Sequence, residues 1–143
     1  MIAYFDTSAF VPLLIDEPAS SFCRRLWDDA DAIVTSRLLY VETAAALALG
    51  VRLGRLTDAE HTSALRLHNQ LWREFDVVEA DEDVINRAAD LAYELALRGY
   101  DAVHTASAKQ VNAEDLVVAS GDRKLLEGCA KLGMATADTV SPA

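Results

Sequence analysis

A chain of 143 residues has room for one domain, and its 52% hydrophobic residues can fill a packed core, which excludes an intrinsically disordered chain. The formal net charge of −10 argues against a protein that coats nucleic acids through a broad basic face. It favours a protein that holds cations or docks a basic partner. We expect a single domain over residues 1–143.

No apolar stretch approaches the roughly 20 residues that a membrane span requires. The opening residues 1–6 have no basic lead and reach an acid at once, so we do not expect a signal peptide. Cys23 and Cys129 stand far apart in helix-like apolar surroundings, without the spacing of a metal motif. We expect two buried free thiols and a cytoplasmic protein.

Hydrophobic periodicity and turn residues predict twelve elements. In chain order they are a strand over 1–5, helices over 8–15 and 19–30, a strand over 32–35, helices over 37–53 and 57–74, a strand over 76–79, helices over 83–98 and 101–111, a strand over 116–119, a helix over 123–132 and an edge strand over 133–136. Gly54 and Gly99 are expected to end the helices before them, and Thr57 with Glu60 forms a capping-box pattern.

Strands and helices alternate along the chain, and the strands are continuously apolar. This pattern is typical of an α/β fold in which a parallel sheet of four to five short strands is buried between helices. Ligands of such sheets bind at the carboxyl ends of the strands. The acids that follow strands are therefore the first candidates for a site.

Three aspartates are predicted at helix N-termini near strand ends: Asp6, Asp101 and Asp122. Each could be no more than a helix cap, because aspartate is a preferred N-cap residue. Glu42 differs, since Leu38, Leu39, Ala45 and Ala46 surround it at helical spacing. A carboxylate on an apolar face is costly unless it is paired, neutralised or bound to a metal, or reaches water at the rim.

Together the four acids predict one site, because the fold rule places the strand ends at one edge of the sheet. Clustered carboxylates repel one another unless a cation intervenes. An all-oxygen set suits Mg²⁺, or Mn²⁺, rather than zinc. Such a site can support hydrolysis of a phosphodiester.

Three stretches and one acid, spread nearly end to end, are distinctive: residues 4–9 (YFDTSA), Glu42, residues 97–104 (LRGYDAVH) and residues 117–122 (VVASGD). In these the chain resembles the PIN-domain ribonucleases, specifically the VapC-type toxins of bacterial toxin–antitoxin pairs. The resemblance implies a three-layer α/β/α sandwich and a metal-dependent endoribonuclease that cuts structured RNA, often tRNA or rRNA. It also implies a homodimer, silenced by an antitoxin whose C-terminal segment occupies the acidic pocket, often with an arginine.

Residue by residue, the resemblance implies that Asp6 and Asp101 are the most direct metal ligands. Glu42 and Asp122 would bind a second ion or orient water. Asp115 and Asp138 are the alternatives for the place of Asp122. The hydroxyls of Thr7 and Ser120 match positions that hydrogen-bond the acids or water.

Several residues near the predicted pocket have two interpretations. The basic side chains could bind RNA phosphates or could simply lie solvated on the surface; they are Arg37, Arg98, Arg123 and Lys124. For His104, one helical turn after Asp101, we favour a packing role over acid–base work, and we expect Trp27 and Trp72 in the core or at a dimer contact.

Two other classes compete with a nuclease. A phosphatase-like domain would need a second acid two places after Asp6, and a receiver-like domain an acid pair near the first strand; neither is present. A catalytically inactive module that binds a partner protein or RNA is the non-enzymatic alternative, although it has no reason to keep four repelling acids.

Overall fold

The computed structural model describes residues 1–142, which contain one five-stranded parallel sheet in the order β3-β2-β1-β4-β5. The strands are β1 (Ile2–Phe5), β2 (Ala32–Ser36), β3 (Asp76–Val78), β4 (Leu116–Ser120) and β5 (Ala135–Asp138). The helices are α1 (Thr7–Phe10), the 3-10 turn η1 (Val11–Leu13), α2 (Ser20–Asp29), α3 (Leu38–Arg52), α4 (Asp58–Trp72), α5 (Glu82–Glu94), α6 (Gly99–Val111) and α7 (Arg123–Lys131).

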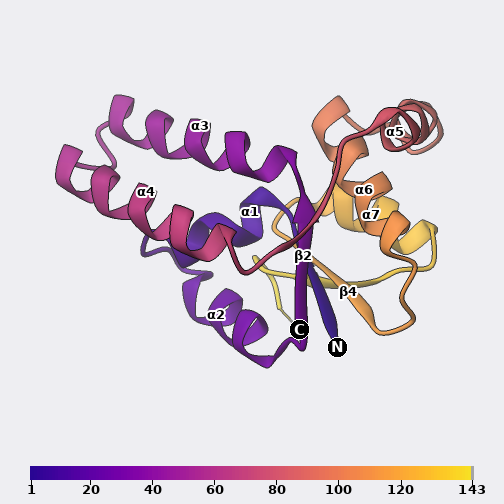
Figure 1. The fold of residues 1–143 in the computed structure, drawn as a ribbon, viewed down its shortest axis with the longest axis horizontal. Coiled ribbons are helices and arrows are strands. Elements are labelled where there is room, and N and C mark those ends of the chain that lie inside the picture. Colours follow the sequence, from indigo (N-terminus) through magenta and orange to yellow (C-terminus); the bar gives the residue numbers. More distant parts are fainter. Residues whose placement is uncertain (143) are drawn as a thin grey trace.

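Helices cover both faces of the sheet, α1 to α4 on one side and α5 to α7 on the other (Figure 1). Strand β1 shows how the sequence builds the two cores. Phe5 packs with Phe10 and Trp27 on the α1–α4 side, whereas Tyr4 packs with Val118 on the α6–α7 side. Successive strand residues point to opposite faces, so a continuously apolar strand is buried twice. The expected three-layer α/β/α sandwich is confirmed.

The end of α5 differs from the prediction. We expected a helix over 83–98 ended by Gly99, but α5 ends at Glu94 and Gly99 is the first residue of α6. Ala96 takes the left-handed conformation at φ 53°, and the Leu97 N–H donates to the Ala92 carbonyl. These are the marks of a Schellman motif, here without its usual glycine. Burial of Leu97 between α5 and α6 supports the turn.

Other boundaries shift by a few residues. The predicted helix 8–15 is split into α1 and η1, with Pro12 at the start of the 3-10 turn, and the edge strand lies over Ala135–Asp138 rather than 133–136. The capping box of Thr57 and Glu60 is confirmed, and Gly54 follows α3 at φ 71°. Cys23 and Cys129 are buried free thiols, as expected. No helix in residues 1–142 is long and apolar enough to span a membrane.

The parallel register fixes where the site lies. Phe5 pairs with Ala119, and the Asp6 N–H donates to the Ala119 carbonyl at 3.2 Å. Asp6 and Ser120 therefore end adjacent strands at the same edge. Strand β2 ends at this edge as well and leads directly into α3, which carries Glu42.

Candidate active site

Asp6 is held by its own turn and by the neighbouring strand. Its Oδ1 accepts from the Ala9 N–H at 3.1 Å and from the Ser8 hydroxyl at 2.7 Å. Its Oδ2 accepts from the Ser120 hydroxyl at 2.8 Å. The N-cap interpretation of Asp6 is therefore correct, yet the side chain is only 5% exposed and has more donors than a cap needs.

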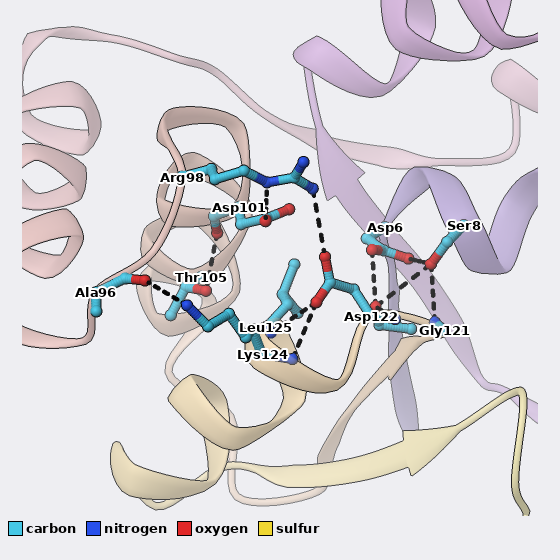
Figure 2. Close-up of polar contacts among 11 residues, drawn as sticks. Asp6, Ser8, Ala96, Arg98, Asp101, Thr105, Gly121, Asp122, Lys124 and Leu125 are labelled. Carbon is cyan, nitrogen blue, oxygen red and sulfur yellow. Dashed lines mark hydrogen bonds and ion pairs between the residues drawn. The ribbon is translucent and has the colours of Figure 1, made fainter.

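The two serines tie Asp6 to the turn that follows β4, as Figure 2 shows for Ser8. The Ser120 Oγ accepts from the Asp122 N–H at 2.9 Å, and the Ser8 Oγ accepts from the Gly121 N–H at 2.8 Å. The Asp122 Oδ1 caps α7 by accepting from the backbone N–H groups of Lys124 and Leu125. Asp6 and Asp122 are thus joined through one shared hydroxyl.

Asp101 lies in the first turn of α6 but does not cap it, because Arg98 is the N-cap residue. The Arg98 guanidinium lies between two acids, 3.4 Å from the Asp101 Oδ2 and 3.7 Å from the Asp122 Oδ2 (Figure 2). Burial raises the pKa of Asp101, and the nearby Asp122 charge raises it further, while Arg98 and His104 lower it. Two like charges are therefore close enough to repel, with a cation between them.

Glu42 reaches the same region from α3. Its Oε1 accepts from the Thr7 hydroxyl at 3.0 Å and lies 2.6 Å from the His104 Nε2. The other ring nitrogen, Nδ1, lies 2.8 Å from the Tyr4 hydroxyl. Glu42 is therefore paired rather than merely placed at the rim of an apolar face.

Nearby charged groups act on two of the four acids, Asp6 and Asp101. Burial raises the pKa of Asp6, whereas the His104 charge and the donors on its two oxygens lower it. His104 therefore acts on Asp6 and Asp101 and contacts Glu42. In the part of the chain that the structure describes, no three His, Cys, Asp or Glu side chains are close enough to form a ready metal centre. Instead, Ser120 links Asp6 to Asp122, Arg98 links Asp101 to Asp122, and Glu42 pairs with His104.

The remaining predicted residues have other partners. Arg37 forms a two-pronged ion pair with Glu79 and lies over the Trp72 ring. Asp115 lies near the Met1 amino group at the start of β4, and Asp138, at the end of β5, accepts from two N–H groups of its own turn. Hydrogen bonds from the Ser141 and Val140 N–H groups lower the pKa of Asp138, and the charge of Arg123 lowers it further.

Three further side chains take part in the site in ways that the sequence analysis does not predict. The sequence analysis does not name Ser8 as a site residue, although Ser8 stands two residues after Asp6, where a hydroxyl can donate back to an N-cap carboxylate. Tyr4 was assigned to the strand alone, although it shares a strand face with Asp6. His104 was assigned to packing; it is 2% exposed, as that predicts, but it also contacts Glu42.

Comparison with known proteins agrees with the fold. A family model for the PIN domain matches residues 3–131, and the chain therefore belongs to the PIN-domain family.

Within that family, its relatives include VapC ribonucleases. The chain is 46% identical over 132 residues to ribonucleases VapC45 and VapC49 of Mycobacterium tuberculosis, covering 92% of this chain and 92% of each relative. Solved structures share the fold. One is the M. tuberculosis toxin VapC20, a sarcin–ricin loop cleaving toxin, with TM-score 0.67, 18% identity, and 93% and 96% of the two chains covered. Another is a toxin–antitoxin complex from Klebsiella pneumoniae, with TM-score 0.63, 17% identity, and 88% and 91% covered.

Proposed function

We propose that this protein is a metal-dependent endoribonuclease toxin whose site comprises Asp6, Glu42, Asp101 and Asp122. The observation that carries the proposal is the hydrogen-bonded and charge-coupled set of acids at the carboxyl edge of a parallel sheet. Its relatives at 46% identity are named as ribonucleases. The substrate class we propose is structured RNA, such as a loop of tRNA or rRNA.

The residues fit Mg²⁺ or Mn²⁺ on chemical grounds. All four candidate ligands offer carboxylate oxygens, which hard divalent cations prefer. Mg²⁺ keeps several waters and is usually held by one or two carboxylates, so an open rim of acids suits it better than a tight cage. The Arg98 guanidinium lies between the carboxylates of Asp101 and Asp122, which supports the view that a positive charge is favoured there.

The chain's own groups would position the reactants. Ser8 and Ser120 hold both oxygens of Asp6, while Thr7 and His104 hold one oxygen of Glu42. A divalent cation would supply positive charge for the phosphoryl transition state and acidify the attacking water. Arg98, with its side chain 84% exposed, can leave its two acids to contact an RNA phosphate.

The test is RNA cleavage with matched acid variants. Wild-type protein incubated with total RNA in Mg²⁺ should give few, discrete 5′ ends, and a chelator should abolish them. Asp6→Asn and Asp101→Asn should each lower cleavage by at least about 100-fold. Asp115→Asn is the matched control, because Asp115 lies beside the Met1 amino group, at the start of β4; it should retain full activity. Cleavage that survives chelation would refute the proposal, and a folded wild type without cleavage would favour the inactive module.

We also propose an antitoxin partner whose C-terminal segment enters the acidic pocket. The net charge of −10 favours a basic partner. The Arg98 ion pairs give a local example of a guanidinium on these carboxylates, which an incoming arginine could reproduce. Wild type should bind a basic C-terminal antitoxin peptide, and the double variant Asp101→Asn/Asp122→Asn should bind it at least about tenfold more weakly. Equal binding by both proteins would contradict this role of the pocket.

A homodimer is the third part of the proposal. Val41 and Leu49 lie on one side of α3 and Leu53 directly follows the helix, with 45% to 60% of their surfaces exposed. Apolar side chains gathered on one helix are typical of a protein–protein contact. Light scattering should give twice the mass of the chain, and Val41→Glu with Leu53→Glu should give a monomer. A monomeric wild type at micromolar concentration would contradict this part.

A further inference from the structure

A buried chain of hydrogen bonds runs behind Glu42, toward the sheet. The Tyr4 hydroxyl lies 2.8 Å from the His104 Nδ1, and the His104 Nε2 lies 2.6 Å from the Glu42 Oε1. Tyr4 is fully buried on β1, and His104 is 2% exposed on α6. Three separate elements, β1, α6 and α3, therefore meet through one imidazole ring.

Both ring nitrogens of His104 are engaged. The His104 Nε2–H donates to Glu42 and Nδ1 pairs with the Tyr4 hydroxyl, so each ring nitrogen has a protein partner. Because both nitrogens have protein partners and the ring is enclosed, neither nitrogen is available to a substrate or to water. This geometry excludes His104 as a general acid or base that contacts RNA.

Glu42 needs such support more than the aspartates do. Asp6 and Asp122 are fixed by backbone N–H groups of the helices that they cap. Glu42 lies inside α3, where the backbone N–H groups are already used within the helix. It is also a longer side chain, with more rotamer freedom to lose on being ordered. The donors that fix its Oε1 come from Thr7 on α1 and His104 on α6.

From this arrangement we propose that His104, backed by Tyr4, is a positioning residue that fixes Glu42 for divalent-cation binding. The inference rests on the proposed function, since it concerns the same acidic site. It goes further in assigning to the Tyr4–His104 pair a part of the site's cation affinity. Groups that orient a metal-binding side chain commonly contribute 10–100-fold in metal affinity.

The experiment uses two isosteric replacements of His104. A glutamine amide can take the place of Nε2 and still donate to Glu42, whereas an asparagine amide reaches only the place of Nδ1, facing Tyr4. His68→Asn is the control, because His68 is also an enclosed histidine, 1% exposed, whose Nε2 bonds to the Tyr40 carbonyl rather than to an acid. Mn²⁺ dissociation constants are measured without RNA by electron paramagnetic resonance, and stability by urea unfolding.

We expect His104→Asn to weaken Mn²⁺ binding at least about tenfold and His104→Gln to stay within about threefold of wild type. Tyr4→Phe, which keeps the ring and removes the hydroxyl, should weaken it about threefold. His68→Asn should leave the affinity unchanged even where it lowers stability more. Equal Mn²⁺ affinity in His104→Asn and wild type overturns the inference, as does an equal loss in His68→Asn.

Failure of the proposed function has a different signature. A wild type that binds Mn²⁺ but cleaves no RNA refutes the nuclease while the effect of His104→Asn still decides the positioning role. A wild type that cleaves RNA, together with a His104→Asn variant that keeps its Mn²⁺ affinity, refutes the positioning role alone. A wild type that binds no Mn²⁺ refutes both.

Discussion

Replacing Ser120 with alanine tests whether the hydroxyl between Asp6 and Asp122 holds the site together. Ser120 is fully buried; its Oγ donates to the Asp6 Oδ2 at 2.8 Å and accepts from the Asp122 N–H at 2.9 Å. Losing a hydrogen bond to a buried carboxylate costs about 2 kcal/mol, and leaving the Asp122 N–H without its acceptor costs about 1 kcal/mol more. Ser120→Ala should therefore lower the free energy of unfolding by about 3 kcal/mol.

Ser107→Ala provides the matched comparison. Ser107 is equally buried, but its Oγ donates at 2.7 Å to the Val103 carbonyl, a neutral acceptor within its own helix. Its loss should cost about 1 kcal/mol. Urea unfolding in a chelating buffer at pH 7 measures both variants, and the melting temperature of Ser120→Ala should fall by about 9 °C. If Ser120→Ala costs no more than Ser107→Ala, the carboxylate-holding role of Ser120 is wrong.

Three further predictions concern other parts of the molecule. Arg98→Ala should strengthen Mn²⁺ binding about twofold, because it removes a largely solvent-exposed cation from Asp101 and Asp122. The same variant should raise KM for RNA. Unchanged values in both assays would contradict the place of Arg98 in the site. The Phe10 ring is fully buried, with its centroid 5.2 Å from that of Phe75 and 6.0 Å from that of Trp27. Phe10→Ala should therefore lower the free energy of unfolding by about 4 kcal/mol. A loss below about 1 kcal/mol in urea unfolding would contradict that packing. Burial raises the pKa of the Cys23 and Cys129 thiols to about 11, so neither should react with a thiol reagent at pH 8 until the chain unfolds; rapid labelling of native protein would refute their burial.

Much of the fold could be predicted because its causes are local. Continuous apolar strands alternating with helices specify a buried parallel sheet, and the sheet has the expected parallel, helix-covered form. The capping of α1 by Asp6 and of α7 by Asp122 follows from residue type. The end of α5 could not be read locally, because Ala96 adopts a conformation that its sequence does not favour and the packing of Leu97 supports the turn.

The candidate site shows the same division. Asp6 and Asp122 follow adjacent parallel strands, so the topology alone brings them to one edge. The partner of Glu42 was not predictable, because His104 lies 62 residues away and meets Glu42 only once α3 and α6 are in place. The Arg98 ion pairs depend in the same way on how α6 and α7 are placed at this edge.

The most direct test of the central claim is anomalous diffraction from crystals soaked in Mn²⁺. The account predicts an anomalous peak at the carboxyl edge of the sheet, bounded by the carboxylates of Asp6 and Asp101, and its disappearance in Asp6→Asn crystals. Mn²⁺ peaks confined to other surfaces of the wild-type protein, or a peak at this edge that persists unchanged in Asp6→Asn, would contradict it.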